Sequence, residues 1–465
     1  MPLEEVSKGA AYSPVMMTIT LRTLVAAGIQ DPAVRMWQLD ITCAYVTAKP
    51  KRVIWVRSPP GRGSGNPLLA RLVEKALYGD PESGRCFWEE VTEFHEHLGF
   101  QRTHHDQCFM LLYVSDEEWI RCGWHVDDGA FAQKGERLWR WYLFQLRTKY
   151  NYSLEPLSFF CGTTFDIDYK KGIVVMRQTH LIEKALRDLG FDGPAFKTHR
   201  HPTPAGQQPS LEEIPEQLDE ATANFPMRKA LGYATYIHAS TRPDIGYGLK
   251  VASKFGEKKG PGPVAWITHV WGYLKATKEK GLIYRRVAHT LRNQLQICTD
   301  ASHAGDPDTR RSISGVIMKL GGNTIFWKCL FQSIVAHSST ESELMALDKG
   351  CTTGQLAKWL CLAVGRMPNL PIPIFVDNQS AVTLASNPIQ SGRNLHMHAR
   401  YFYVRDMIKA GEYVLHYLST KDMISDALVT FKGGPNHSRL CAMLMGCAYL
   451  LRTEGSWVWQ TEYLD

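Results

Sequence analysis

The feature that most constrains this 465-residue chain is a pair of adjacent carboxylates, Asp127 and Asp128, set between two short apolar segments. Residues 119–126 and 129–131 have the pattern of paired strands, so the sequence predicts a β-hairpin with the acidic pair at its turn. Adjacent carboxylates repel each other, and divalent cations would offset that repulsion, because carboxylate oxygens suit Mg²⁺. A metal-free Asp-Asp turn has the same sequence, so this motif alone does not establish a metal site.

A third carboxylate lies upstream of the hairpin. Asp40 interrupts residues 36–46, which are rich in apolar and β-branched side chains and predict a strand. A carboxylate buried in a strand needs a polar partner or a metal. The aromatic residue Tyr45 follows five positions later. A strand carboxylate, an aromatic residue and a hairpin acid pair together are typical of a polymerase palm, in which such carboxylates hold two metal ions.

Four further carboxylates form a second candidate site. Asp300 and Asp377 each end a predicted strand, Glu343 lies in a helical pattern, and Asp426 begins another helical segment. Carboxylates at strand ends and on helices can converge at one edge of a sheet. Four of them can bind two Mg²⁺ ions there and align water against a scissile phosphate.

The composition is that of globular domains with a mildly basic balance. Apolar residues make up 44% of the chain and charged residues 21%, and 53 Lys and Arg against 46 Asp and Glu give a net charge of +7. This charge suits a polyanionic partner without requiring one. The 11 Cys form no CxxC pair, which disfavours a zinc ribbon or a disulfide framework. The N-terminus lacks a signal-peptide pattern, and no membrane partner is expected.

The order of the predicted elements indicates several domains. Short strands alternate with helices up to about residue 170, and from residue 291 the expected order is strand, strand, helix, strand, helix. Leu440–Leu451 is apolar but too short to cross a bilayer, so a helix facing the core or a partner is expected. Other expected segments are helices at 84–97, 136–149, 180–189 and 265–276, a flexible loop at 61–67 and a Pro-rich linker at 201–215.

These motifs occur together in a known order. Over roughly residues 10–430 the chain resembles the reverse transcriptase and ribonuclease H portion of a copia-type LTR retrotransposon Pol polyprotein. The collinear motifs are Tyr12-Ser-Pro-Val, Gln38-Leu-Asp-Ile, Ala76-Leu-Tyr-Gly79, His125-Val-Asp-Asp128, Phe160-Cys-Gly162, Thr241-Arg-Pro-Asp-Ile245, Tyr273-Leu-Lys-Ala-Thr277, Gly305-Asp-Pro-Asp-Thr-Arg-Arg-Ser312, Ser338-Ser-Thr-Glu-Ser-Glu343 and Val376-Asp-Asn-Gln-Ser-Ala381.

The resemblance implies an α+β multidomain fold. A polymerase palm with incomplete fingers would be followed by thumb and connection helices, and then by an α/β ribonuclease H-like domain. The expected boundaries are 1–170 for the fingers remnant and palm, 171–288 for thumb and connection with a linker near 201–220, 289–432 for the ribonuclease H-like domain, and 433–465 for an unassigned tail.

The resemblance also assigns roles to residues. Asp40, Asp127 and Asp128 would hold two Mg²⁺ at the polymerase site, with Mn²⁺ as a substitute. The second set, Asp300, Glu343, Asp377 and Asp426, would hold two more at the nuclease site. For Asp426 the alternative is an acid favoured by a helix N-terminus. Glu341, two positions from Glu343, is expected to point away and to be solvated. The expected substrate contacts are Tyr45 under the nucleotide sugar, His125 and Gly162 near the primer end, Arg85 on a template phosphate or in a surface salt bridge, and Arg310 and Arg311 on the hybrid backbone.

The chain departs from the family pattern at several points. His125 stands where the family usually has Tyr, which puts polymerase efficiency in question. Asp80 and Glu82 lie in a segment near the nucleotide site, where their charge would repel phosphate. The late start of the similarity indicates an N-terminally truncated piece, and the tail beyond about Lys432 does not resemble the family.

The leading functional hypothesis is an RNA-dependent DNA polymerase with ribonuclease H activity. The alternatives are a ribonuclease H-only fragment and an inactive or repurposed nucleic-acid-binding remnant. The expected partners are an RNA template, a DNA primer, an RNA–DNA hybrid and dNTPs, with self-association or other Pol- and Gag-derived chains as further partners. The expected location is intracellular, either cytoplasmic in a virus-like particle or nuclear.

Overall fold

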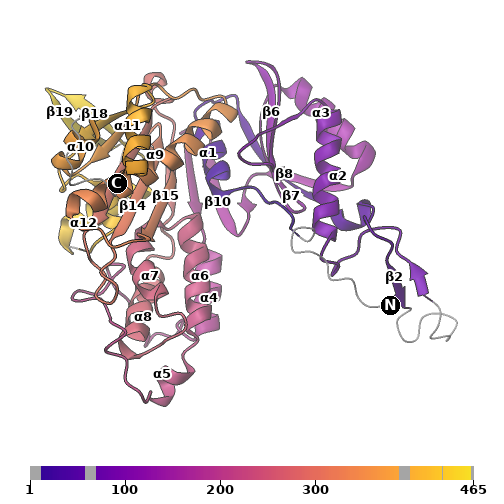
Figure 1. Cartoon of the computed structure of the whole chain (residues 1–465). Helices are drawn as coiled ribbons and strands as arrows, with labels where there is room; N and C mark the ends of the chain where they lie inside the picture. Colours follow the sequence, from indigo (N-terminus) through magenta and orange to yellow (C-terminus); the bar gives the residue numbers. More distant parts are fainter. Residues whose placement is uncertain (1–11, 58–69, 387–397, 432, 462–465) are drawn as a thin grey trace. The chain divides into compact units, whose positions relative to one another are not determined.

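The computed structural model describes residues 12–57, 70–386, 398–431 and 433–461. The chain divides into two compact units, residues 1–24 with 33–161, and residues 25–32 with 162–465 (Figure 1). The segments expected as thumb and connection, ribonuclease H-like domain and tail all lie in the second unit. The expected loop at 61–67 lies outside the described residues.

The first unit is built on a six-stranded antiparallel sheet with the strand order β4-β5-β6-β7-β1-β8. Its helices α2 and α3 confirm the two helices predicted at 84–97 and 136–149. Helix α1 (Thr18–Gly28) begins in this unit and ends in the second. The other elements are β1 (Arg35–Ile41), η1 (Ala44–Thr47), β2 (Trp55–Arg57), β3 (Ala70–Leu72), α2 (Ser83–His97), β4 (Gln101–Arg102), β5 (Phe109–Ser115), β6 (Glu118–His125), β7 (Asp128–Lys134), α3 (Glu136–Lys149), β8 (Tyr152–Pro156) and β9 (Phe159–Phe160).

An aromatic core holds α2 and α3 against this sheet. At its centre, fully buried His95 pairs through Nδ1 with the Val91 carbonyl at 2.7 Å and through Nε2 with the Tyr142 hydroxyl at 2.9 Å. The His95 and Trp124 rings pack edge to face, with 5.4 Å between their centroids. Trp124 lies on the hairpin strand two residues before the turn residue Val126, so this ring contact packs the hairpin against the core.

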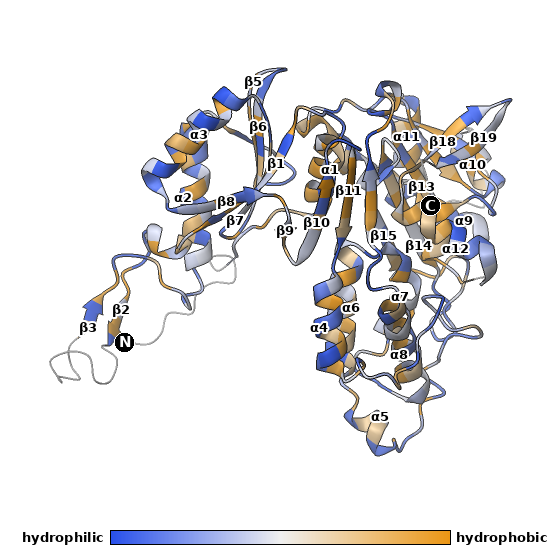
Figure 2. Cartoon of the chain, turned by 180° about the vertical axis from the view of Figure 1, so that it is seen from behind, coloured by the Kyte–Doolittle hydropathy of each residue, from blue (hydrophilic) through white to orange (hydrophobic). Residues whose placement is uncertain are grey.

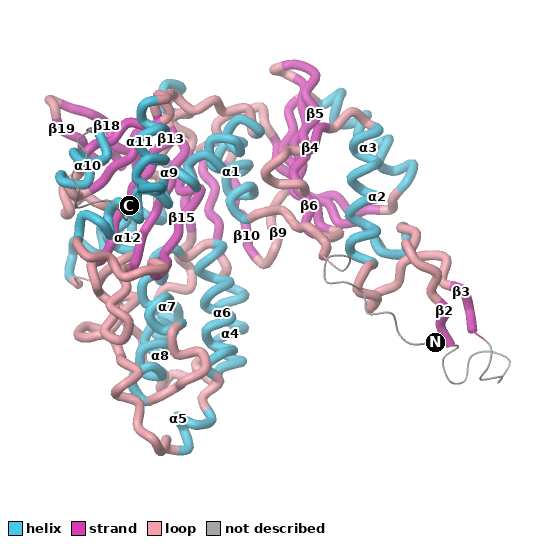
Figure 3. The backbone as a smooth tube through the Cα atoms, viewed as in Figure 1, coloured by secondary structure: helices cyan, strands magenta, loops and turns pink. Residues whose placement is uncertain are grey.

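Among the described residues, the second unit contains two larger sheets, a short two-stranded sheet within residues 448–461, and a group of helices. In one sheet β10, β11 and β12 pair antiparallel, and α4, α6, α7 and α8 lie side by side around one apolar core (Figure 3). The helices α6 and α8 carry hydrophobic and polar stretches, as Figure 2 shows. Helices α4 and α8 confirm the predicted helices at 180–189 and 265–276. The bounds are β10 (Thr163–Asp168), β11 (Ile173–Arg177), α4 (Thr179–Leu189), α5 (Glu220–Asn224), α6 (Met227–Ser240), η2 (Pro243–Ile245), α7 (Gly246–Ser253), α8 (Pro261–Ala276), β12 (Leu282–Arg285) and η3 (His289–Leu291).

The other larger sheet of this unit has the strand order β15-β14-β13-β16-β17. Strand β13 pairs antiparallel with β14 and parallel with β16. Every residue of β14 is buried, as expected for a sheet strand covered on both faces. The remaining elements are β13 (Leu295–Ser302), β14 (Ile313–Leu320), β15 (Asn323–Phe331), α9 (Ser339–Ala363), β16 (Ile372–Val376), α10 (Gln379–Ser386), α11 (His398–Lys409), β17 (Tyr413–Tyr417), η5 (Ile424–Leu428), α12 (Gly434–Met445), β18 (Ala448–Thr453) and β19 (Ser456–Thr461).

Two expectations for this region were wrong. Three strands precede α9 rather than two, because β15 also pairs with β14. The expected helix at 440–451 ends at Met445, and the chain continues as β18, which pairs with β19. The physical reason is tertiary: the Gln296 side chain donates to the Leu450 carbonyl at 2.7 Å and accepts from the Leu450 amide at 2.9 Å. These bonds hold an extended backbone that the local sequence does not specify.

Within the part of the chain that the structure describes, no helix combines the length and the apolar character needed to span a bilayer.

The buried histidine predicts a pH dependence of stability for the first unit. Burial lowers the pKa of His95 to about 4, against an ordinary value of 6.5. Above pH 6.5 His95 is neutral in both folded and unfolded chains. As the pH falls below 6.5 only the unfolded chain takes up the proton, so we expect about 3 kcal/mol of stability to be lost by pH 4.

The measurement is urea unfolding followed by aromatic fluorescence between pH 4 and 7, comparing wild type with His95→Gln. The variant should lose less stability across this range. His97→Gln is the matched control, because His97 lies on the same helix but is exposed. Identical pH profiles for wild type and His95→Gln would contradict the assignment.

Candidate active sites

The acidic pair lies at a strained hairpin turn, as the sequence predicted. Strands β6 and β7 pair so that His125 faces Asp128, leaving Val126 and Asp127 as the two turn residues. Val126 has φ of 60°, in the left-handed region that favours glycine at this position of a two-residue turn. A β-branched residue held there costs conformational free energy, and such strain is found preferentially at functional sites.

Strand order, rather than sequence distance, brings the third carboxylate to this turn. Strand β1 pairs with β7 so that Asp40 lies opposite Asp128, and the Ile41 amide donates to the Asp127 carbonyl at 3.2 Å. Desolvation and then the charge of Asp127 raise the pKa of Asp40. Desolvation, Asp127 and Asp40 likewise raise the pKa of Asp128. The three carboxylates therefore repel one another at one edge of the sheet, where a cation would be stabilised.

Tyr45 lies beside these carboxylates, although not on the strand that was predicted. Strand β1 ends at Ile41, and Tyr45 is in the 3₁₀ helix η1, preceded by Cys43 with φ of 56°. The Tyr45 ring packs on Tyr78 with 4.7 Å between centroids. Desolvation and the charge of Asp127 raise the pKa of Tyr45.

The charged residues around this site are largely paired. Arg85 on α2 donates from Nε to Glu89 at 2.8 Å and lies over the Trp88 ring, so its contacts in this structure are those of a salt bridge. Asp80 and Glu82 both pair with Arg52. The single Arg52 guanidinium offsets part of their charge, and the expected repulsion of phosphate stays a prediction.

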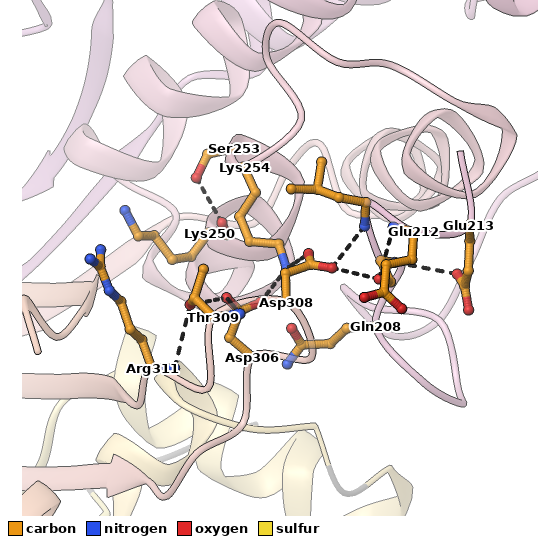
Figure 4. Close-up of polar contacts among 12 residues, drawn as sticks. Gln208, Glu212, Glu213, Lys250, Ser253, Lys254, Asp306, Asp308, Thr309 and Arg311 are labelled. Atoms are coloured by element: carbon orange, nitrogen blue, oxygen red, sulfur yellow. Dashed lines mark hydrogen bonds and ion pairs between the residues drawn. The ribbon is translucent and has the colours of Figure 1, made fainter. Parts of the chain in front are cut away.

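Gly162 and the two arginines lie in loops of the second unit. Gly162 has φ of 68°, which explains why glycine is favoured there. Arg310 and Arg311 are exposed in the loop between β13 and β14. The loop is fixed by Lys254, which pairs with Asp306 and, at 2.9 Å, with Asp308, while the Arg311 side chain extends away from this cluster (Figure 4).

Three of the four carboxylates predicted for the second site converge. Strands β13 and β16 run parallel and end at the same edge of the sheet, which brings Asp300 close to Asp377, directly after β16. Glu343 projects from the first turns of α9. Potential ligand oxygens of these three residues all lie within 4.8 Å of one another. Within the part of the chain that the structure describes, these three side chains form a group close enough together to hold a metal ion.

Two glycines that the sequence analysis overlooked let α9 approach the sheet. A β-carbon on Gly350 would lie 2.5 Å from Thr299 Cγ2, and one on Gly354 would lie 2.7 Å from Ile297 Cδ1. Any larger residue would push the helix away from β13 and Glu343 away from Asp300. Their four-residue spacing, which places both on one helix face, was the available signal.

Burial makes the second site strongly electrostatic. Asp300 and Glu343 are 4% and 5% exposed. Burial, together with Asp300 and Asp377, raises the pKa of Glu343 to about 10. Its Oε1 accepts from the Ala301 amide at 3.2 Å, whereas buried Oε2 accepts no hydrogen bond from the described residues. An all-oxygen donor set with a buried oxygen available fits a hard divalent cation.

Other acidic residues near this site have separate roles. Asp377 accepts a hydrogen bond from the Thr420 hydroxyl at 2.9 Å, a contact that the sequence analysis did not identify. Asp426 is buried in η5, which packs on β13 and β14, but it is outside the three-carboxylate group. Glu341 was expected to be solvated, and this was wrong. It is 4% exposed because it accepts from the His337 amide at 2.6 Å while Ser338 caps the same helix start.

Comparison with known proteins identifies what the chain is similar to. Residues 4–201 match the family model described as reverse transcriptase (RNA-dependent DNA polymerase). The chain is 26% identical over 445 residues to the retrovirus-related Pol polyprotein from transposon TNT 1-94 of Nicotiana tabacum, covering 94% of this chain and 32% of that protein. The chain is similar to copia-type Pol polyproteins over 90% or more of its length. The resemblance inferred from its motifs is thereby confirmed.

Other members of the Pol family match at similar levels. The polyprotein from transposon RE1 of Arabidopsis thaliana is 24% identical over 428 residues, covering 90% of this chain and 28% of that protein. The chain thus spans about a third of the length of these Pol relatives. Among solved structures, LC11-RNase H1 isolated from compost has 18% identity and a TM-score of 0.24, covering 30% of this chain and 93% of that one.

The three-carboxylate group predicts a stabilising effect of Mg²⁺ that depends on Glu343. Glu343→Gln replaces a protonated buried carboxyl by an isosteric amide, so we expect stability in EDTA to be retained. Mg²⁺ at about 100 times its Kd should stabilise the parent by about 2.7 kcal/mol and the variant far less. The measurement is thermal unfolding in an Asp128→Asn background, in which the first site is disabled.

Glu341→Ala is the matched control on the same helix. It should lose about 1 kcal/mol through its helix cap, yet keep the response to Mg²⁺. An equal response to Mg²⁺ in the Glu343→Gln variant would show that Glu343 is not a ligand.

Proposed function

We propose that the chain catalyses phosphoryl transfer at two separate sites. Asp40, Asp127 and Asp128 would serve RNA-directed DNA synthesis, and the second carboxylate group would hydrolyse the RNA strand of an RNA–DNA hybrid. The observation that carries the proposal is the convergence of Asp300, Glu343 and Asp377 within a chain whose first unit carries the reverse transcriptase match. The first unit then corresponds to a polymerase palm, and the α4–α8 helices to thumb and connection elements.

At the polymerase site the chain's residues would hold the cation and orient the nucleotide. Asp40 and Asp128 lie opposite each other on paired strands, so their separation is set by the sheet rather than by mobile loops. Tyr45, backed by Tyr78, would lie under the nucleotide sugar. When bound, Mg²⁺ would neutralise phosphate charge and lower the pKa of the attacking hydroxyl. His125, opposite Asp128, would face the primer end.

At the nuclease site Asp300, Glu343 and Asp377 would hold the cation, with Asp426 as a further ligand after rearrangement. The Thr420 hydroxyl orients one oxygen of Asp377, which leaves its other oxygen to face the group. Burial of Asp300 and Glu343 would strengthen the attraction of their carboxylates for a divalent cation. Arg310 and Arg311, exposed on their loop, would contact the hybrid backbone.

The substrates follow from this assignment. They are an RNA template, a DNA primer, dNTPs and an RNA–DNA hybrid, and the place of action would be intracellular, beside other Pol- and Gag-derived chains.

Two amide variants should separate the activities. Asp128→Asn should lower primer extension on an RNA template by two or more orders of magnitude and leave hybrid cleavage intact. Asp377→Asn should do the reverse. Both activities are measured on one preparation with labelled substrates, and Asp116→Asn and Asp406→Asn, which change exposed carboxylates away from both sites, are the controls. Loss of both activities in either single variant would refute two independent sites.

The exposed loop that carries Arg310 and Arg311 should account for part of the salt dependence of hybrid binding. Removing one arginine that binds a phosphate should reduce the slope of log K against log salt by about 1, and weaken binding similarly for all sequences. Arg310→Ala and Arg311→Ala are compared with Arg228→Ala, whose exposed side chain pairs with Glu257. If both loop variants keep the wild-type slope of log K against log salt, the loop is not part of the hybrid-binding surface.

A further inference from the structure

A cavity of about 380 Å³ in the second unit has no part in either carboxylate site. Helix α12, residues 200–202 and the segment from Tyr273 to Arg285 supply its walls. Its volume lies at the lower end of the range for small-molecule pockets. We call it the α12 cavity.

The charges at the α12 cavity favour an anion. Arg200 and Lys280 line it, both are exposed, and neither side chain has a hydrogen bond or ion pair within the described residues. The lining carboxylate, Glu279, is already engaged by Arg177 at 3.5 Å and by the Thr179 hydroxyl at 3.1 Å. The Arg200 and Lys280 side chains are therefore available to an anion at the rim of the cavity.

The rest of the wall favours an apolar group. Ile283, Ala442 and Met445 line the cavity together with the Tyr273 ring. The Tyr273 hydroxyl is occupied by its 2.6 Å bond to buried Asp244, so only its ring is available to a ligand. A flat ring would pack favourably on the methionine thioether and on the aromatic face.

The buried His437 and Cys441 side chains in the cavity wall are suited to contacting a ligand and not to reacting with it. His437 Nε2 lies 3.6 Å from Cys441 Sγ, and both side chains are buried. Burial lowers the pKa of His437 to about 4 and raises the pKa of the Cys441 thiol well above its ordinary value. Both groups are therefore neutral near pH 7, and the thiol is not a nucleophile.

We propose that the α12 cavity binds a small organic phosphate with a flat ring, of the class of a nucleoside monophosphate. The phosphate lies against Arg200 and Lys280, and the ring lies between Ile283 and Met445. Arginine and lysine at an exposed rim are suited to phosphate oxygens. This inference does not rest on the activity proposed above, because the cavity shares no residue with either carboxylate site.

The test is calorimetric titration of the full chain with AMP in EDTA, which removes metal-dependent binding at the other sites. Adenosine and inorganic phosphate, titrated alone, each represent one half of the ligand. We expect AMP to saturate one site, with each half binding at least tenfold more weakly. Absence of AMP binding, or phosphate binding as tightly as AMP, would overturn the proposal.

Variants locate the binding. Lys280→Glu should weaken AMP binding at least tenfold, whereas Lys258→Glu, an exposed lysine away from the cavity, should not. Ala442→Trp fills the cavity from an exposed helix position, so the fold is preserved, and it should abolish binding with the rim charges intact. Unchanged AMP affinity in Lys280→Glu and Ala442→Trp would place the nucleotide elsewhere and refute the assignment.

Discussion

Repulsion between neighbouring carboxylates is the constraint on which the rest of this structure depends. Asp300, Glu343 and Asp377 bring potential ligand oxygens within 4.8 Å of one another, two of these residues in a buried environment. Removing such groups from water and placing them together costs free energy, and no local interaction offsets that cost. The surrounding elements must therefore be positioned by other forces. Parallel pairing of β13 with β16 fixes the two aspartates, and close packing at Gly350 and Gly354 fixes the helix that carries Glu343.

Much of this arrangement could be predicted from the sequence, because it depends on local patterns. The hairpin around Asp127 and Asp128 has alternating strands and a two-residue turn, and helices such as Glu136–Lys149 have a regular apolar period. The placement of Asp300 and Asp377 at the ends of strands also followed from local pattern. The sequence analysis did not predict that β13 and β16 are neighbours in one sheet, and the structure supplies their parallel pairing.

The features that were not predicted have two different causes. Strand β15 pairs with its neighbour β14 across the Gly321-Gly322 turn, so a local hairpin signal was overlooked. The extended segment after Met445 depends on a partner far away in sequence, the Gln296 side chain that holds Leu450. Buried Lys319 likewise donates to the Gly322 and Gly446 carbonyls, at 3.0 and 2.9 Å. These bonds satisfy backbone groups in a buried region, where an unpaired carbonyl is costly. The segment that the sequence analysis left as an unassigned tail is thus packed into the same unit as Asp300, Glu343 and Asp377.

Both candidate sites bring mutually repelling carboxylates together, but the two sites differ in their exposure to water. Asp40 is exposed and Asp127 and Asp128 are half-buried, so water still solvates their charges. The second group is buried, and there the pKa of Glu343 rises to about 10, so this carboxyl carries a proton near neutral pH when no cation is bound. Protonation relieves the repulsion that the fold imposes, and a cation must replace that proton when it binds. The proton on Glu343 and a bound cation are therefore alternative ways of relieving the repulsion at one crowded sheet edge.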